Sequence, residues 1–107
     1  MNHAGDDDVF KALADPARRE LLDRLHGQDG QTLGALCAGL AMTRQAVSKH
    51  LAILEAANLV ATLKEGRRKL HFLNPVPIQA IADRWIGKYR QPPLRALADL
   101  KRNLEGE

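Results

Sequence analysis

Cysteine, aromatic residues and long apolar runs are scarce in this sequence of 107 residues. Cys37 is the only cysteine, so no disulfide forms within the chain, which fits a reducing cytoplasm. No apolar run approaches the roughly 20 residues that a membrane-spanning helix needs. The segment from Met1 to Asp8 is acidic and lacks an apolar stretch, so we expect no signal peptide there. These absences argue against a secreted or membrane-spanning protein.

Catalytic motifs are also missing from the sequence. Ser48 has no base at a motif-like spacing, no glycine-rich phosphate loop occurs, and the carboxylates fall mainly on predicted solvated faces. Ser48 and His50 stand at i and i+2 of a predicted helix, where side chains point about 200° apart and do not act together. The length and apolar fraction indicate one compact domain, residues 1–107, and no enzyme. Such a small core is often supported by oligomerisation.

The positive charge is concentrated in the middle of the chain. Residues 43–73 carry six basic and two acidic side chains, whereas residues 1–42 carry four basic and seven acidic ones. Residues 74–107 carry six basic and four acidic side chains. A basic segment beside an acidic one indicates a polyanionic partner that docks on one face.

The segment 43–56 is predicted to be a helix with one apolar stripe. Thr43 is a suitable N-cap, and the stripe consists of Val47, Leu51 and Leu54. The other face has no carboxylate and carries Arg44, Gln45, Ser48, Lys49 and Ala52. Such a face suits the major groove of DNA, because Gln pairs with adenine and Arg or Lys with guanine or phosphate. An ordinary amphipathic surface helix has the same pattern, so the helix alone leaves both interpretations open.

Shorter helices are predicted before this segment. Asp15 and Pro16 end a helix over about residues 8–14 and begin one over residues 17–25, with Asp15 as N-cap. Gly27 is the expected C-cap of that second helix.

A third short helix is predicted over residues 33–40, capped by Thr32. Only residues 41–42 separate it from the helix capped by Thr43. Two helices joined by so tight a turn indicate a helix-turn-helix, whose second helix enters the groove.

A hairpin follows, with predicted strands over residues 59–64 and 68–73. Its tight turn is expected at Glu65-Gly66 or Gly66-Arg67. The basic side chains near the tip are Lys64, Arg67, Arg68 and Lys69. After a helix-turn-helix, such a hairpin indicates a wing that contacts the DNA backbone or the minor groove. The alternative is an ordinary hairpin whose loop is charged for solubility.

The last third of the chain has a wide apolar helix face, from Ile78 to Tyr89, followed by leucines up to Leu104. Pro92 and Pro93 interrupt it, so the final segment is either a second helix or a kinked extension. We predict that the N-terminal helix (about 8–14) and the C-terminal helices (about 76–104) form a two-fold dimer interface. The alternative is that they cap the core of a monomer. The residues expected in the interface are Val9, Phe10, Leu13, Ile81, Trp85, Ile86 and Tyr89.

Three motifs, within about residues 9–90, resemble those of ArsR-type bacterial winged helix-turn-helix regulators. The first is the run from Phe10 to Leu22, and the second runs from Thr43 to Val60 with a Val-Ser-x-His-Leu centre. The third is Glu65-Gly66-Arg67-Arg68-Lys69 followed by Phe72-Leu73-Asn74-Pro75. The resemblance implies a mainly α fold with a small β-hairpin, with five or six helices in the order α-α-α-α-β-β-α.

The resemblance also implies a function: a cytoplasmic, homodimeric transcriptional regulator, in most members a repressor, that binds a palindromic operator in double-stranded DNA. Adding Lys64 at the hairpin tip, the expected DNA-binding residues are Thr43, Arg44, Gln45, Ser48, Lys49, His50, Lys64, Arg67 and Arg68. For His50, two interpretations stay open: a bond to phosphate, or packing at the helix boundary.

Better-known members sense metals through clustered cysteines or through Asp and His on the last helix. This chain has Cys37 alone and no histidine after His71, so we expect no metal site and no cofactor. Cys37 is interpreted as a small core residue, with a thiol switch as the alternative. Two rival functions follow, a metal- or thiol-responsive sensor of the same fold and a winged-helix module that binds an acidic protein.

Overall fold

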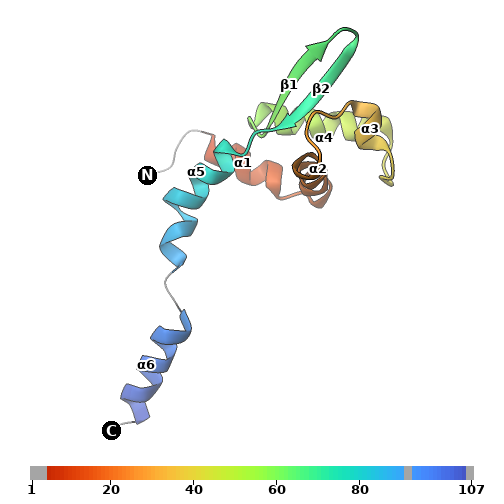
Figure 1. The fold of residues 1–107 in the computed structure, drawn as a ribbon. Helices are drawn as coiled ribbons and strands as arrows, with labels where there is room; N and C mark the ends of the chain where they lie inside the picture. The colour runs from red at the N-terminus through yellow and green to blue at the C-terminus, as the bar shows by residue number, and fades with distance from the viewer. Residues whose placement is uncertain (1–4, 91–92, 106–107) are drawn as a thin grey trace.

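The computed structural model describes residues 5–90 and 93–105 and confirms a winged helix-turn-helix fold (Figure 1). The described elements are α1 (Asp6–Leu13), α2 (Pro16–Gly27), α3 (Leu33–Cys37), α4 (Arg44–Ala56), β1 (Val60–Glu65), β2 (Arg68–Leu73), α5 (Val76–Arg84), the 3₁₀-helix η1 (Ile86–Tyr89) and α6 (Pro93–Glu105). The β1–β2 hairpin projects from one end of the helical body, and α6 extends from the other (Figure 1). None of the helices in these two ranges is long and apolar enough to cross a membrane.

The core lies between α4 and the helices around it. The predicted stripe of α4, which is Val47, Leu51 and Leu54, is buried, so the polar side of this helix faces outward. Leu21 and Leu25 of α2 are fully buried in the same cluster. Burying side chains of this size is the main favourable contribution to folding. The core therefore fixes which side of α4 remains exposed.

Three side chains cap the helices as predicted. The Asp15 carboxylate accepts hydrogen bonds from the backbone amides of Ala17 (2.7 Å) and Arg18 (3.4 Å). The hydroxyls of Thr32 and Thr43 accept from the third residue of α3 and of α4, at 3.2 Å and 3.1 Å. Each bond satisfies an amide that has no partner within its helix.

Two predicted helix ends are wrong. Gly27 is the last residue of α2 rather than its C-cap, which is Gln28 in an extended conformation. The helix predicted over 33–40 ends at Cys37, because Ala38 is extended and Gly39 has a φ of +79°. The Arg24 guanidinium donates to the Ala38 carbonyl (2.7 Å), which satisfies a group that a longer helix would have bonded internally.

The apolar helix predicted from Ile78 to Tyr89 is also interrupted. Regular helix α5 ends at Arg84, and η1 follows from Ile86. Trp85 packs edge-on against Phe10 of α1, with ring centroids 5.7 Å apart, and Gly87 lowers the helix propensity just beyond. After residues 91–92, which lie outside the described ranges, α6 is a separate helix.

The hairpin is fixed at its base. Its strands pair antiparallel from Val60↔Leu73 to Glu65↔Arg68, which leaves Gly66-Arg67 as the turn, with Gly66 at a φ of +62°. His71 is buried and forms an isolated bridge with Gln31, where its amide donates to the Gln31 carbonyl at 2.8 Å. The hairpin is therefore tied to the loop before α3.

Candidate nucleic-acid interface

The outward side of α4 presents the predicted polar residues to solvent. Because the buried stripe orients the helix, the exposed side chains near its N-terminal end are Thr43, Arg44, Gln45, Ser48 and Lys49. We call Arg44, Gln45, Ser48 and Lys49 the reading face. It carries two cations and two neutral groups that donate and accept hydrogen bonds, and no carboxylate. This composition matches the base edges and phosphates of a major groove.

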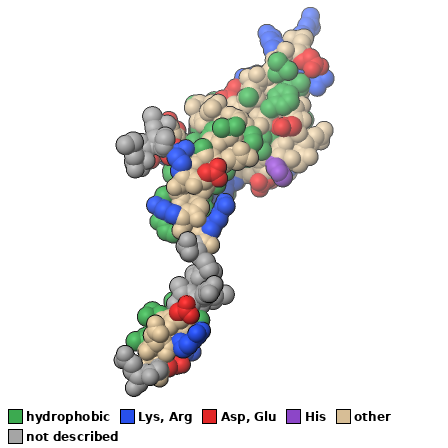
Figure 2. Space-filling view, turned by 60° about the vertical axis from the view of Figure 1, so that its left-hand side comes forward, with side chains coloured by type: hydrophobic (Ala, Val, Ile, Leu, Met, Phe, Trp, Pro, Cys, Tyr) green, Lys and Arg blue, Asp and Glu red, His purple; other side chains and the backbone are tan. Residues whose placement is uncertain are grey.

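The hairpin carries the second group of cations. Lys64, Arg67, Arg68 and Lys69 are all exposed, and Figure 2 shows Lys and Arg side chains gathered at its tip. The Lys69 ammonium lies 3.5 Å from the carboxylate of Glu55 on α4. This ion pair joins the hairpin directly to the helix with the reading face.

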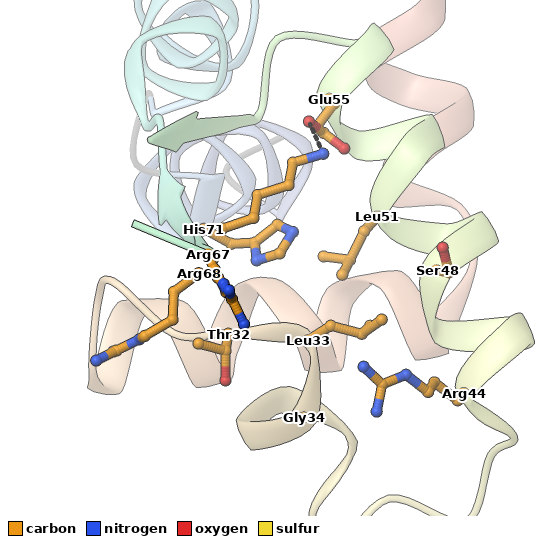
Figure 3. Close-up of a pocket in the computed structure, with 11 residues that line it drawn as sticks. Thr32, Leu33, Gly34, Arg44, Ser48, Leu51, Glu55, Arg67, Arg68 and His71 are labelled. Atoms are coloured by element: carbon orange, nitrogen blue, oxygen red, sulfur yellow. Dashed lines mark ion pairs between the residues drawn. The ribbon is translucent and has the colours of Figure 1, made fainter. Parts of the chain in front are cut away.

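A hollow of 490 Å³ separates the two groups, between α3, α4 and the hairpin. Arg44 reaches it from α4, whereas Arg67 and Arg68 stand on the hairpin side (Figure 3). Hydroxyl groups of Thr32 and Ser48 also line it. Cations on both sides of a groove suit a phosphodiester strand, which carries one charge per nucleotide.

Sequence reasoning placed none of the α3 residues in this site. Thr32 is predicted only as a helix cap, and Leu33 only as part of the helix over 33–40, yet both line the hollow. Their sequence neighbours give no sign of this, because the hairpin is brought to α3 by distant contacts such as the pairing of His71 with Gln31.

His50 differs from the other predicted DNA-binding residues. It is half-buried, and its Nδ1 lies 3.4 Å from Nη1 of Arg18 on α2. The Arg18 guanidinium also lies 3.6 Å from the Asp15 carboxylate. Of the two interpretations left open by the sequence, the structure favours packing at the helix boundary.

The pKa of Asp15 is held below its usual value, chiefly by the hydrogen bond from the Ala17 amide. The amide of Arg18 and the charge of Arg18 act in the same direction. The carboxylate is therefore stabilised in its charged form at the start of α2, where the helix dipole also favours a negative charge.

A different surface lies on α1 and η1, away from the hollow. Phe10, Trp85, Ile86 and Tyr89 are 42–65% exposed, and we call them the apolar face. Trp85 touches both other rings edge-on, with its centroid 5.7 Å from that of Phe10 and 5.6 Å from that of Tyr89. The other residues predicted for the interface are placed inside the protomer: Val9 and Ile81 are buried, and Leu13 packs against the core.

Metal-ligating residues do not gather anywhere in residues 5–90 and 93–105, where no group of three or more His, Cys, Asp or Glu side chains could hold an ion. Cys37 is partly buried and packs against the core cluster.

The fold agrees with the comparisons to known proteins. A model described as a helix-turn-helix domain matches residues 13–62. An uncharacterised HTH-type transcriptional regulator of Bacillus subtilis, YuzN, is 37% identical over 86 residues, which are 75% of this chain and 94% of YuzN. An ArsR-like transcriptional regulator from Rhodococcus sp. RHA1 superposes with a TM-score of 0.74 at 33% identity, covering 97% of this chain and 94% of that structure. The chain belongs to the ArsR family.

This ArsR-family chain is therefore a DNA-binding transcriptional regulator and not an enzyme. A further relative, the transcriptional repressor SdpR of B. subtilis, is 35% identical over 71 residues, which are 66% of this chain and 78% of SdpR. The family resemblance seen in the sequence is confirmed. The mainly α fold with a small β-hairpin that it implied is confirmed as well.

Proposed function

We propose that this regulator is a homodimeric repressor that binds an inverted-repeat operator. Each protomer places the 43–56 helix in a major groove, while the 64–69 wing contacts the adjacent backbone or minor groove. The observation that carries the proposal is the hollow between α4 and the hairpin, with Arg44 on one side and Arg67 and Arg68 on the other. The phosphodiester strand that separates a major from a minor groove fits between them, since the two elements then enter neighbouring grooves.

The side chains divide into two roles in this proposal. Arg44, Gln45 and Ser48 read base edges, because they lie on the exposed side of the first turns of α4. Lys49, Lys64, Arg67 and Arg68 bind phosphates, because they are exposed cations on the flanks of that reading surface. Thr43 caps the helix and keeps its N-terminal end ordered against the DNA. His50 lies behind this surface, where it contacts Arg18 rather than the DNA.

The proposed dimer uses the regions of about residues 8–14 and 76–104. The apolar face on α1 and η1 consists of four large side chains, and Leu97, Leu100 and Leu104 of α6 are 56–70% exposed. Monomeric proteins rarely expose contiguous apolar patches beyond a few hundred Å². Aromatic side chains bury about 150–250 Å² each, so the apolar face alone falls short of the roughly 800 Å² per partner in a standard interface. Adding the leucines of α6 brings the area closer to that size.

Repression and location are inferred from the family and from the DNA partner. SdpR is named a repressor, and a dimer seated on an operator blocks access to the promoter. We place the protein in the cytoplasm, with the DNA that it binds. DNA binding without a metal is part of this proposal, because the sequence has a single cysteine and no histidine after His71.

The decisive experiment is selection of bound fragments from a random duplex pool at near-physiological salt, followed by anisotropy titrations of the recovered sequences. An enriched inverted repeat is the expected result, with two half-sites about one helical turn, or a multiple of it, apart. Salt-sensitive binding without enrichment would refute a sequence-specific operator. Binding as one protomer per duplex would refute the dimer.

Two variants separate the proposed roles. Gln45→Ala is expected to alter the preferred base at its position, with a discrimination change of about 1–3 kcal/mol. Arg68→Ala should weaken binding to all duplexes alike and reduce the salt slope by about 1. Arg19→Ala, which removes an exposed cation of α2 outside the wing and outside the regions proposed for the dimer, is the matched control. Equal losses on every sequence for Gln45→Ala and Arg68→Ala would refute this division.

A further inference from the structure

The guanidinium group of Arg18 on α2 contacts the end of α1. Its Nε donates to the carbonyl of Ala12 (2.8 Å), and its Nη2 donates to the carbonyl of Lys11 (3.0 Å). Both carbonyls belong to the last turn of α1, where few amides remain to bond them, and that of Lys11 also accepts from the amide of Ala14 (3.3 Å). The side chain is only 14% exposed; its bond to Ala12 is partly buried, whereas its bond to Lys11 is exposed. A planar, always charged donor fork is well suited to bridge two such groups.

The remaining nitrogen of the same group faces α4. Nη1 of Arg18 lies 3.4 Å from Nδ1 of His50 and 3.6 Å from the carboxylate of Asp15. A guanidinium has only donors, so a hydrogen bond at this contact requires Nδ1 of His50 to accept and the ring proton to reside on Nε2. One side chain thus touches the end of α1, the start of α2 and the middle of α4.

Two of these helices, α1 and α4, have different roles in the proposed function. α1 carries Phe10 of the apolar face, whereas α4 carries the reading face. In a dimer built on α1, the separation of the two α4 helices depends on the angle between α1 and α4 within each protomer. A bond network that fixes this angle therefore fixes the half-site spacing that the dimer accepts.

We propose that Arg18 is a positioning residue that acts through His50 to hold the helix with the reading face at a fixed angle to the dimer helix α1. It contributes to the choice of operator spacing without contacting DNA. This inference rests on the proposed dimeric function, and its tests are chosen so that the two can fail separately.

Arg19 provides the matched control. It is the next residue, and its Nη1 donates to the Leu13 carbonyl (2.7 Å), so it too bonds the end of α1. Within residues 5–90 and 93–105, the Arg19 side chain makes no hydrogen bond to α4. Comparing Arg18→Gln with Arg19→Gln therefore separates the link to α4 from the mere capping of α1.

The first test measures binding to the selected inverted repeat and to versions with one base pair inserted or removed between half-sites. Such a change rotates the half-sites by about 35°. The wild type and Arg19→Gln should bind the original spacing at least about fivefold more tightly than the altered ones. Arg18→Gln and His50→Ala should lose most of this preference, and the double variant should lose no more than either single one. Unchanged spacing preference in folded, dimeric Arg18→Gln would overturn the inference.

The second test needs no DNA, so it can be carried out even if no operator is found. The ¹⁵N shifts of the His50 imidazole report which ring nitrogen carries the proton. The expected result is the Nε2–H form in the wild type and Arg19→Gln, and a changed signal in Arg18→Gln. Arg18→Lys, which keeps the charge but loses the planar fork, guards against loss of folding in the glutamine variant. The same His50 signal in all four proteins would overturn the link, whether or not an operator is found.

Discussion

The reading face with its wing and the apolar face of α1 and η1 are both exposed, but their chemistry is opposite. The first has cations on both sides of a hollow, and the second consists of three aromatic rings and an isoleucine. Charged side chains are ordinarily well solvated on a surface, so their exposure costs nothing. Exposed aromatic rings are different, since their burial against a partner is favourable.

This difference shows how each surface selects a partner. The cationic hollow attracts a polyanion over a long range, and that attraction weakens with salt. The apolar face acts only at contact and is insensitive to charge, as expected for a protein–protein interface. Substitutions on the two surfaces should therefore affect different measurements.

The largest expected effect comes from the core between the two surfaces. Leu54 is fully buried on α4, so Leu54→Ala should lower the free energy of unfolding by about 2–5 kcal/mol through lost burial and a cavity. DNA binding and self-association should then fall together. Its neighbour Ile53 is 43% exposed, and Ile53→Ala should change stability by less than about 1 kcal/mol. Equal losses of unfolding free energy for Leu54→Ala and Ile53→Ala in urea denaturation would show that the core is assigned wrongly.

The next effect isolates the apolar face. Trp85 touches both Phe10 and Tyr89, so Trp85→Ala should weaken self-association by about 2 kcal/mol, or roughly 30-fold in the dimer Kd. Sedimentation equilibrium measures this directly. Leu63→Ala, which truncates an exposed apolar residue of β1 outside the proposed interface, is the control and should leave the dimer intact. A dimer unaffected by loss of Trp85 would place the interface elsewhere.

A smaller effect isolates the hollow. Glu55→Gln removes the carboxylate that pairs with Lys69, which frees that cation for a phosphate. We expect tighter binding to every duplex and a salt slope steeper by about 0.9, with little change in stability because the pair is partly exposed. Glu20→Gln on α2 should change neither quantity. Weaker binding of Glu55→Gln would mean that the ion pair positions the wing for DNA.

The smallest effect concerns acid stability. Because the folded-state pKa of Asp15 lies below its usual value, its charge stabilises the fold above that usual value. The stabilisation is lost as the pH falls through the lowered pKa. Asp15→Asn keeps an N-capping oxygen without the charge, so it should be less stable than the wild type at neutral pH and converge with it in acid. Denaturation curves measured at neutral and at acid pH test this prediction. The same difference in the free energy of unfolding between wild type and Asp15→Asn at both pH values would contradict it.

Local signals predicted much of the structure. Asp15, Thr32 and Thr43 were identified as N-caps because the capping oxygen and its amide are two or three residues apart. The stripe of α4 was equally readable, since helical spacing alone brings its members to one face. Asn58, directly after the C-cap of α4, has a φ of +63°, a left-handed conformation that Asn tolerates.

Other features depend on contacts that sequence spacing does not encode. The hollow includes Thr32 because His71 pairs with Gln31, 40 residues away. The break after Arg84 accompanies the packing of Trp85 on Phe10, and His50 turns towards Arg18 of another helix.

By itself, the sequence determined the order of helices and strands, the polar surface of α4 and the basic wing, because each depends on neighbouring residues and on helical or strand periodicity. Only the tertiary structure decided which predicted interface residues are exposed, how α4 and the wing enclose a hollow, and that Arg18 connects three helices. These features arise when segments far apart in the chain are packed against one core, and such packing sets distances that no local pattern contains.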